Sequence, residues 1–385
     1  MSFPGDAGGM PLASDHEPLL RLLHGGAPAS ALRRLLDTHG DAAAALAAGP
    51  RDWASHGLGA EACAAIRRPD AAALAQGLHW LDGDAHHLLG WRDDGYPPLL
   101  RRIASPPAML FVAGDPALLW RPAVAVVGSR TATAGGRANA AQFAEALARA
   151  GLCVASGLAA GIDAAAHAAT LEAGGATVAV LGTGPDIAYP ARNRPLMARI
   201  EASGAVVSEH PPGTQPLRTH FPSRNRILAG LALGTLVVEA ALQSGALITA
   251  RLAAEAGREV FALPGSIHNP MARGCHRLLR EGAALVETPA EVVDALAPLA
   301  VELARALRGV LEADASAPPA AGAAPPPDDP DLYRLWQALG HDPTSMDELV
   351  ERTGLTAAVA SSMLLALELE GRIAAEHGRY SRIGG

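Results

Sequence analysis

Short apolar runs alternate with longer stretches of helical periodicity between residues 108 and 296, and this alternation constrains the fold more than any other feature of the sequence. Strands that alternate with helices in this way form a mainly parallel sheet with helices on both faces, joined by right-handed crossovers. We therefore expect an α/β domain. Its expected strands are residues 109–112, 124–127, 153–155, 177–181, 205–208, 236–238, 260–262 and 285–286.

The residues before and after this domain differ from it in composition and periodicity. The sequence therefore predicts five segments, one of which is the α/β domain. Residues 1–16 are rich in Gly, Pro and Ser and are expected to be disordered. In residues 17–85, leucine and alanine recur at helical spacing between glycine breaks, so a small helical domain is expected there. Residues 86–300 hold the α/β domain, and residues 301–330 hold a helix end and an Ala/Pro-rich linker. Residues 331–385 form the last segment.

The last segment shows three helical stretches followed by two short runs that could pair as a β-wing. This order is typical of a winged helix–turn–helix. The third stretch, residues 356–370, contains no arginine or lysine that could contact phosphates or guanine edges. We therefore expect a protein-interaction or weak DNA-binding role for it, which disfavours a transcriptional regulator acting through this segment.

Charge and cysteine content narrow the function classes. The formal net charge is −8, but nucleic-acid binding depends on a local basic patch rather than on the total. All 31 basic residues are arginine, so any anion site must use guanidinium groups. Cys63, Cys153 and Cys275 form no Cys-x-x-Cys pair, which fits a reducing compartment and argues against zinc. With neither a long apolar span nor a basic leader, the chain is expected to be soluble and cytoplasmic.

Unusual residues collect at the carboxyl ends of the expected strands, where ligands bind in parallel sheets. Gly128-Ser-Arg130 follows the strand at 124–127 and precedes a helix, an arrangement that can present backbone N–H groups and a guanidinium to a phosphate. An ordinary β–α turn with a solvated arginine is the competing interpretation. The fingerprint Gly-x-Gly-x-x-Gly is absent, so a dinucleotide cofactor is not favoured.

Two other strand ends carry polar residues. Ser156 and Gly157 precede Asp163 and His167, which lie four residues apart on one helix face. That pair could be an acid–base pair or half of a metal site, but structural pairing is favoured because no third ligand has fitting spacing.

Arginines and aromatic residues lie together in residues 189–194 and 218–226. Arginine for the phosphates and an aromatic ring for base stacking are the general requirements for binding single-stranded nucleic acid. A solvated charged loop is the alternative, although it would not need the aromatic residues. Residues 234–249 would also suit a ribose or nucleotide pocket.

Eleven motifs in order over about residues 120–290 make the sequence closely resemble the DprA/Smf family, the DNA-processing proteins of bacterial natural transformation. One departure is His276, where the family usually has asparagine. The matching motifs are Val127-Gly-Ser-Arg130, Ser156-Gly-Leu-Ala-Ala-Gly-Ile-Asp163, Ala166-His167, Val180-Leu-Gly182, Tyr189-Pro190, Ser208-Glu209, Phe221-Pro-Ser-Arg-Asn-Arg226, Val238-Glu239, Ser244-Gly-Ala-Leu-Ile-Thr-Ala250, Gly257-Arg-Glu-Val260 and Pro264-Gly265.

The resemblance implies an extended Rossmann-like sheet between an N-terminal SAM-like helical domain and a C-terminal winged helix. It implies a protein without catalytic residues, metal or cofactor that binds and protects incoming single-stranded DNA in competence and recombination. Such a protein would form a homodimer or larger assembly through residues around 246–256 and 274–285, and would load the RecA recombinase. Taken with the residue patterns, it predicts single-stranded DNA contacts at Gly128, Ser129, Arg130, Ser156, Gly157, Arg192, Arg218, Phe221, Arg224, Asn225, Arg226, Ser244 and Gly245.

The alternative is a nucleotide-processing enzyme resembling the nucleoside-monophosphate phosphoribohydrolases, which share a related sheet. Glu239 would then be the catalytic carboxylate and Arg226 the phosphate clamp. Against this alternative, the chain lacks the Pro-Gly-Gly-x-Gly-Thr loop of those enzymes and has Leu231-Ala-Leu-Gly-Thr235 instead.

Overall fold

A computed structural model describes residues 13–316, 330–339, 344–369, 373–376 and 379–382. The chain divides into two compact units, the first ending at Val301 and the second beginning at Glu302. Residues 317–329, within the segment 301–330 expected to hold a helix end and a linker, lie outside the described residues, as do the first twelve residues of the N-terminal segment expected to be disordered. Among the described residues, no helix combines the length and apolar character needed to cross a bilayer.

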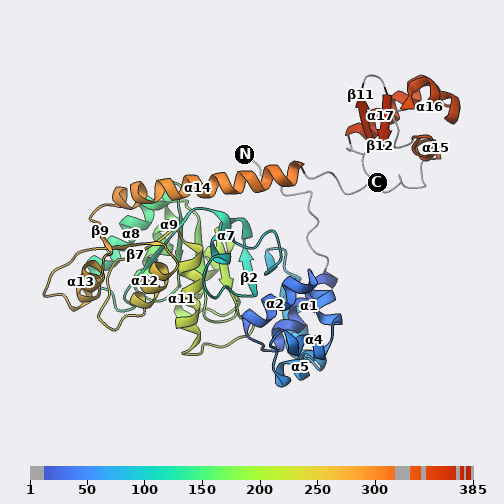
Figure 1. The fold of residues 1–385 in the computed structure, drawn as a ribbon. Coiled ribbons are helices and arrows are strands. Elements are labelled where there is room, and N and C mark those ends of the chain that lie inside the picture. Colours follow the sequence, from blue (N-terminus) through green and yellow to red (C-terminus); the bar gives the residue numbers. More distant parts are fainter. Residues whose placement is uncertain (1–12, 317–329, 340–343, 370–372, 377–378, 383–385) are drawn as a thin grey trace. The chain divides into compact units, whose positions relative to one another are not determined.

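A nine-stranded sheet forms the centre of the first unit (Figure 1). Its strands are β1 (His86–Gly90), β2 (Met109–Gly114), β3 (Ala123–Val127), β4 (Cys153–Ser156), β5 (Thr177–Val180), β6 (Ala205–Ser208), β7 (Gly234–Val237), β8 (Glu259–Ala262) and β9 (Ala284–Leu285). They lie in the order β1-β2-β6-β5-β4-β3-β7-β8-β9. All neighbours are parallel except β1 with β2 and β2 with β6, so the α/β fold class predicted from the sequence is confirmed.

One strand of this nine-stranded sheet was not predicted. β1 reads His-His-Leu-Leu-Gly, and its two histidines and short apolar run hide its strand character. It becomes a strand by pairing antiparallel with β2, with Leu88 opposite Phe111. Pairing between distant segments therefore extends the sheet beyond what local propensity indicates.

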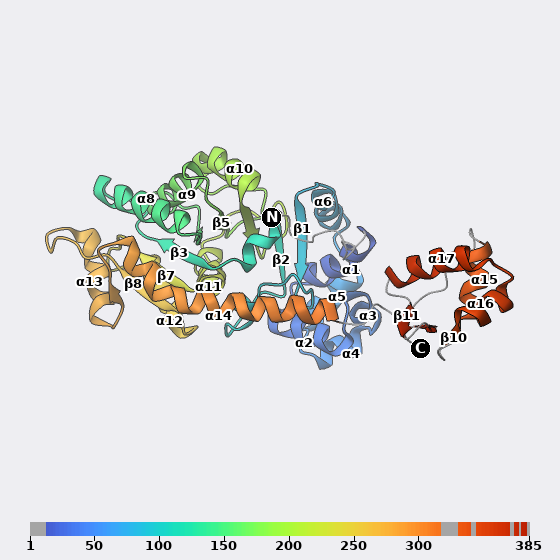
Figure 2. The same cartoon turned by 90° about the horizontal axis from the view of Figure 1, so that it is seen from above.

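Helices cover both faces of the sheet, as Figure 2 shows from above. One face carries α8 (Ala134–Arg149), α9 (Ile162–Glu172) and α10 (Arg194–Ser203), and the other carries α11 (His220–Leu231), α12 (Ala246–Glu255) and α13 (Arg273–Arg280). Ala125 and Val127 of β3 face the second group and pack in one core with Ile227 and Leu228 of α11. This packing places the N-terminal end of α11 near the carboxyl ends of the central strands.

The N-terminal helices pack directly on the edge of the sheet. They are α1 (Ala13–His24), α2 (Ala29–His39), α3 (Ala42–Ala47), α4 (Pro50–Ser55), α5 (Ala60–Arg67) and α6 (Ala71–Leu81). Helix α1 begins at Ala13, within the segment expected to be disordered. The buried Leu35 and Ile66 share one apolar core with Met109 and Phe111 of β2, so the helical region and the sheet form one unit rather than separating at residue 85.

The second unit contains a small winged helix. Its elements are α15 (Pro330–Ala338), β10 (Thr344–Ser345), α16 (Met346–Thr353), α17 (Ala357–Leu369), β11 (Ile373–Glu376) and β12 (Arg379–Arg382), and its strands lie in the order β10-β12-β11. Leu335, Leu349 and Leu364 form its core. Helix α14 (Pro289–Ser316) spans the boundary between the units, and its Leu296 is buried in the first.

Candidate nucleic-acid interface

A guanidinium and two aromatic rings lie in a row where β3 ends. Arg130 leaves the turn after β3, and its Cζ lies 5.5 Å from the centroid of the Phe221 ring at the start of α11. The Phe221 ring lies 5.1 Å from that of Tyr189, which is exposed. Arg130 forms no ion pair with any described residue, so its charge is available to a ligand. The two rings are inclined to each other by 38°, and a cation beside such exposed aromatic surface is suited to a phosphate next to an unpaired base.

Two adjoining cavities open around this row, with volumes of about 710 and 260 Å³. Arg130, Tyr189, Phe221 and Arg224 line both. The larger cavity is also lined by Gly128, Ser129, Arg218, Asn225, Ser244 and Gly245, and the smaller by Gly157 and Arg192. We call these two cavities together the strand-end pocket. It brings together eleven of the thirteen residues predicted to contact single-stranded DNA.

The electrostatic character of the strand-end pocket is positive. Arg130, Arg192, Arg218 and Arg224 line it, and Asp163 is its one acidic lining residue. Asp163 is itself buried, so its carboxylate faces the protein more than the solvent. Arg130, Arg192 and Arg218 are exposed at the rim, where their guanidinium groups can reach phosphates.

Arg224 forms the floor of the strand-end pocket. It is 5% exposed, and its Nη1 donates hydrogen bonds to the carbonyls of Gly157, at 2.8 Å, and Val180. Burial lowers the pKa of Arg224 to about 10, so the group still carries its charge at neutral pH. A Cβ on Gly157 would lie 2.5 Å from the Arg224 guanidinium, so a larger residue there would displace that group from its present position. The geometry gives Arg224 a mainly structural role beneath the ligand space.

Ser156 and Arg226 do not line the strand-end pocket, contrary to the expectation from the sequence. The Ser156 side chain is fully buried, and its hydroxyl donates to the carbonyl of Val126 at 2.6 Å. Arg226 pairs with both carboxylate oxygens of Glu209, at 3.1 and 2.6 Å. Helical periodicity explains the second case, because residues two apart on α11 point in different directions.

Asp163 and His167 do not form a catalytic pair. The Asp163 carboxylate accepts hydrogen bonds from the N–H groups of Gly157 and Ala159, at 3.2 and 3.3 Å. His167 Nδ1 lies 2.7 Å from the hydroxyl of Thr177, which donates its own proton to a carbonyl, so the ring is the donor. Burial lowers the pKa of His167 to about 3. Both side chains therefore bond to groups of the protein itself.

Glu239 holds the N-terminus of α8. Its carboxylate accepts hydrogen bonds from the N–H and hydroxyl of Thr133, at 2.9 and 2.7 Å, and lies 3.3 Å from the Asn269 amide nitrogen. Thr133 in turn caps α8 by accepting from Gly136 N–H. The partial positive charge of this helix end is therefore matched by a protein carboxylate. Glu239 and Arg226, the two residues proposed for the enzymatic alternative, do not line the strand-end pocket. Arg226 is instead paired with Glu209.

Some lining residues carried no recognisable signal in the sequence. Gln243 and Met271 line the larger cavity, and Met271 Sδ lies 3.4 Å from the Ser129 hydroxyl. Met271 lies far from the other lining residues in the chain, so only the fold brings it there. Tyr189 is different, because an aromatic residue beside arginines at a strand end was a usable signal.

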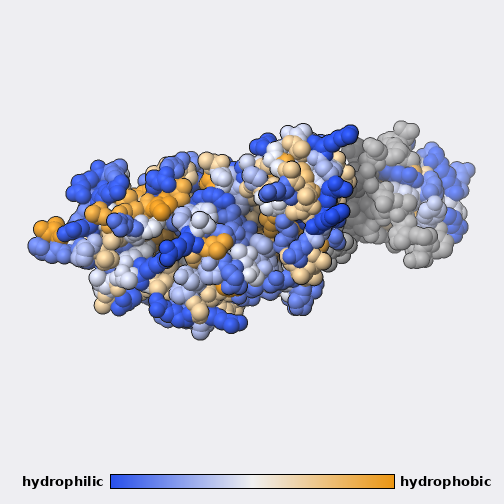
Figure 3. All heavy atoms as spheres, turned by 90° about the horizontal axis from the view of Figure 1, so that it is seen from below, coloured by the Kyte–Doolittle hydropathy of each residue, from blue (hydrophilic) through white to orange (hydrophobic). Residues whose placement is uncertain are grey.

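A second hollow lies between α12, α13 and the β8–β9 edge of the sheet. Its volume is about 640 Å³, and Leu242, Leu247, Arg251, Val260 and Leu278 are among its lining residues. Figure 3 shows apolar surface gathered toward this end of the first unit. We call this hollow the edge groove. His276 on α13 places Nε2 3.0 Å from the carbonyl of Gly265, so the histidine contacts the neighbouring loop.

Comparisons with known proteins agree over most of the chain. Residues 87–297 match the family model of DNA recombination-mediator protein A, and residues 318–379 match that of the DprA winged helix domain. Protein Smf of Escherichia coli K12 is 41% identical over 314 residues, which cover 81% of this chain and 81% of that protein.

Two solved structures resemble the fold. The X-ray structure of DNA processing protein A from Streptococcus pneumoniae superposes with a TM-score of 0.62 at 36% identity, covering 74% of this chain and 98% of that one. A structure of DNA processing protein A from Helicobacter pylori, described for its single-stranded DNA binding mode, gives a TM-score of 0.51 at 27% identity. It covers 55% of this chain and 96% of that one.

Proposed function

The chain belongs to the DNA recombination-mediator protein A family, and on that premise we propose that it binds single-stranded DNA in the strand-end pocket. The observation that carries this proposal is the row formed by Arg130, Phe221 and Tyr189, with the Arg130 Cζ 5.5 Å from the Phe221 centroid. The related Helicobacter pylori protein is described as binding single-stranded DNA, which supports the same chemistry here.

Single-stranded rather than double-stranded DNA fits the pocket for two reasons. An unpaired base can leave its neighbours and stack on the Phe221 and Tyr189 rings, whereas a paired base inside a duplex cannot. The rim arginines can follow a flexible backbone through forked hydrogen bonds to successive phosphates. Because these contacts release counterions, the affinity should fall steeply with salt, by a log–log slope of about 0.7 for each phosphate neutralised.

A titration of single- and double-stranded oligonucleotides at two salt concentrations tests this proposal. We expect oligo-dT to bind more tightly than a duplex of equal length, and its affinity to fall at the higher salt. Equal binding of both forms, or salt-independent binding, would refute the pocket model. A chain ending at Ser316 should keep most of the affinity for oligo-dT, since the strand-end pocket lies wholly in the first unit. Loss of binding in this folded fragment would assign the DNA site to the winged helix.

We also propose that the protein self-associates through the edge groove and, as a recombination mediator, loads the RecA recombinase onto bound DNA. The groove exposes Leu242, an apolar side chain that association would cover. In sedimentation velocity, Leu242→Glu should shift the chain toward the monomer. Val301→Glu is a matched control, because Val301 is about as exposed but lies outside the groove.

RecA loading has its own assay. RecA-dependent strand exchange on DNA coated with single-strand-binding protein should be stimulated by the wild-type chain. It should not be stimulated by a variant that fails to bind oligo-dT. Stimulation by both would separate the two activities and contradict this part of the proposal.

The enzymatic alternative is less well supported. Glu239 caps α8 and Arg226 pairs with Glu209, so neither is free to act on a nucleotide. Incubation with nucleoside monophosphates should therefore release no free base. Base release that is lost in Glu239→Gln would restore the enzymatic interpretation.

A further inference from the structure

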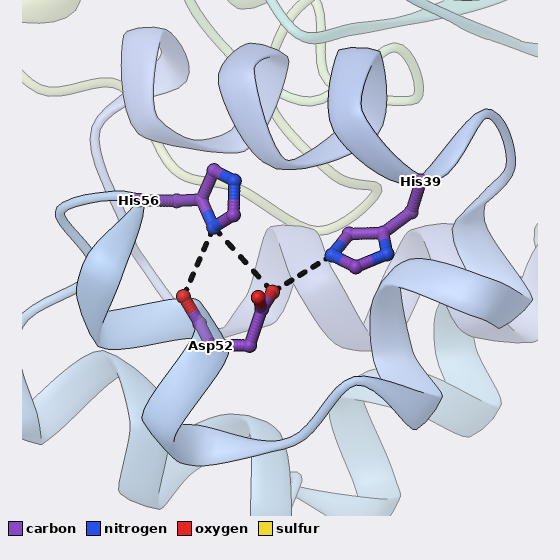
Figure 4. Close-up of side chains that lie close together, drawn as sticks. All are labelled: His39, Asp52 and His56. Atoms are coloured by element: carbon purple, nitrogen blue, oxygen red, sulfur yellow. Dashed lines mark hydrogen bonds and ion pairs between the residues drawn. The ribbon is translucent and has the colours of Figure 1, made fainter.

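Three side chains of the N-terminal helices point toward one another (Figure 4), and none of them lines the strand-end pocket. His39 is the last residue of α2, Asp52 lies in α4, and His56 follows the end of α4. His39 Nε2 lies 2.7 Å, and His56 Nδ1 3.4 Å, from Oδ2 of Asp52. Among the described residues, this is the one group of three such side chains whose ligand atoms all lie within 4.8 Å of one another.

The hydrogen bonds of His56 orient its ring for a cation. Its Nε2 lies 3.0 Å from the hydroxyl of Thr38, and that hydroxyl donates its own proton to the carbonyl of Arg34, at 3.0 Å. The hydroxyl therefore accepts from His56 Nε2–H, which leaves the lone pair of a neutral ring on Nδ1. A partner that fixes the distal N–H in this way is the usual support of a histidine metal ligand.

On its other side, the His56 ring faces only oxygen atoms. Nδ1 lies 2.9 Å from the carbonyl of Asp52, 3.4 Å from Oδ2 of Asp52 and 3.3 Å from the hydroxyl of Ser55. The Ser55 hydroxyl donates to the Asp52 carbonyl at 2.7 Å, so it offers Nδ1 no proton. Oxygen atoms around Nδ1 suit a positive charge at this position, which either a proton on Nδ1 or a metal ion bound by Nδ1 can supply.

We propose that His39 Nε2, Asp52 Oδ2 and His56 Nδ1 bind one divalent transition-metal ion, with Zn²⁺ the best match. Two imidazoles and a carboxylate are a preferred donor set for Zn²⁺. Tetrahedral bonds of about 2.0–2.1 Å place neighbouring donor atoms about 3.3 Å apart. Asp52 Oδ2 lies 2.7 and 3.4 Å from the two histidine nitrogens, near this value, and all three donor atoms lie within 4.8 Å of one another, so side-chain shifts can complete the site.

The burial of the site suits a bound ion with one open position. The side chains of His39, Asp52 and His56 are 22%, 34% and 16% exposed, so the cluster is partly shielded but reaches solvent on one side. A water molecule can supply the fourth ligand there. The ion would tie the end of α2 to α4 across α3 and so stabilise the helical region that packs on the sheet edge.

Sequence patterns did not indicate this site. The metal-ligand patterns visible in the sequence are the three cysteines and the Asp163–His167 pair. Asp52 and His56 have the same four-residue spacing, and the fold supplies the missing third ligand, His39, from thirteen residues before Asp52.

Metal titration of the full-length, tag-free, chelator-stripped chain tests the proposal. We expect one equivalent of Zn²⁺ in competition with a chromogenic indicator. Co²⁺ should give visible bands of a tetrahedral nitrogen–oxygen site and no thiolate charge-transfer band, because Cys63, Cys153 and Cys275 are buried and not ligands. His39→Gln and His56→Gln should each weaken binding at least about tenfold.

Two further variants make the test decisive. Thr38→Val keeps all three ligands but removes the acceptor of His56 Nε2–H, so it should weaken binding about 10- to 100-fold. His79→Gln alters an exposed histidine 3.6 Å from Asp82 and should leave binding unchanged. Circular dichroism checks that each variant is folded. If a variant that lacks a ligand does not fold, the zinc affinity of Thr38→Val tests the site instead.

Three results would overturn the site: a wild-type chain that binds no stoichiometric Zn²⁺, a thiolate band with Co²⁺, or equal affinities in the wild-type chain and the folded Thr38 and His39 variants. The strand-end pocket plays no part in this proposal, so DNA binding should be retained in every variant that stays folded.

Discussion

The rim of the strand-end pocket and the side of α11 that faces the protein both carry arginines, but the two regions use them differently. At the rim, Arg130, Arg192 and Arg218 are exposed and form no ion pair with any described residue. On α11, Arg224 donates hydrogen bonds to two backbone carbonyls, and Arg226 forms an ion pair with the carboxylate of Glu209. The same side chain is therefore left available for a ligand in one region and serves as a structural support in the other.

This difference shows why counting arginines in a segment does not locate a phosphate site. Residues 218–226 contain three arginines, of which one is at the rim, one on the floor and one outside the pocket. A guanidinium already bonded to the protein must break those bonds before it can bind a phosphate. The proposed interface therefore rests on the unpaired charge at the rim rather than on the total number of arginines.

The largest effect should come from Arg224, on the floor of the strand-end pocket, and it should appear in the free energy of unfolding. Arg224→Met should lower the free energy of unfolding by about 3–5 kcal/mol, because the carbonyls of Gly157 and Val180 lose their donor and the buried Asp163 loses a neighbouring cation. Urea denaturation measures it. Arg149→Met is the control, since Arg149 forms an exposed pair with Glu145 on α8, worth about 0.3–0.5 kcal/mol, and lies outside both the strand-end pocket and the edge groove. Similar losses in both variants would mean that Arg224 is not a structural residue.

The next largest effect should come from the Phe221 ring, on which a base is proposed to stack. Phe221→Ala should weaken oligo-dT binding by about 1–3 kcal/mol, which is about 5- to 150-fold, because a base loses its stacking partner. Fluorescence anisotropy measures the affinity, and Phe221→Tyr should restore most of it. If both variants bind as the wild type does, the ring does not stack on a base.

At the rim, Arg130→Ala should reduce the affinity for oligo-dT at least about tenfold, since a charge-assisted bidentate contact is lost. Arg130→Lys should recover only part of the loss, because an ammonium group lacks the planar fork. The salt dependence should also fall by the slope of about one phosphate contact. Wild-type affinity in Arg130→Ala would remove Arg130 from the interface.

The smallest effect on DNA binding should be at Arg226. Arg226→Ala should leave the affinity for oligo-dT within about twofold of the wild type, since its guanidinium is paired with Glu209 and both side chains are mostly buried. Its effect should appear in the urea midpoint instead. A tenfold loss of DNA affinity in a folded Arg226→Ala chain would contradict the distinction between rim and inner face.

Much of the fold could be predicted because its signals are local. The runs at 124–127 and 205–208 are apolar and bounded by turns, and both are buried strands. β1 was missed because its strand character depends on β2. The helical region and the sheet were expected to be separate, but Leu35 and Phe111 share one core, which no local pattern could show.

The sequence predicted those residues of the strand-end pocket whose position follows directly from the end of a strand. Gly128, Ser129 and Arg130 follow β3, and the ends of parallel strands meet at one edge, so their position follows from the strand order. Ser156 was placed there by the same rule, but it is the last residue of β4 and its side chain turns into the core. A shift of one residue along a strand reverses the direction of a side chain.

By itself, the sequence determined the alternating α/β core, the winged helix and the family, because apolar periodicity and motif order are properties of neighbouring residues. Only the tertiary structure decided which arginines stay free and which histidines meet. Arg226 is neutralised by Glu209, seventeen residues earlier, and His39 meets Asp52 across α3. Charge pairing and metal geometry act through space at a few ångströms, and the distance along the chain does not determine those separations.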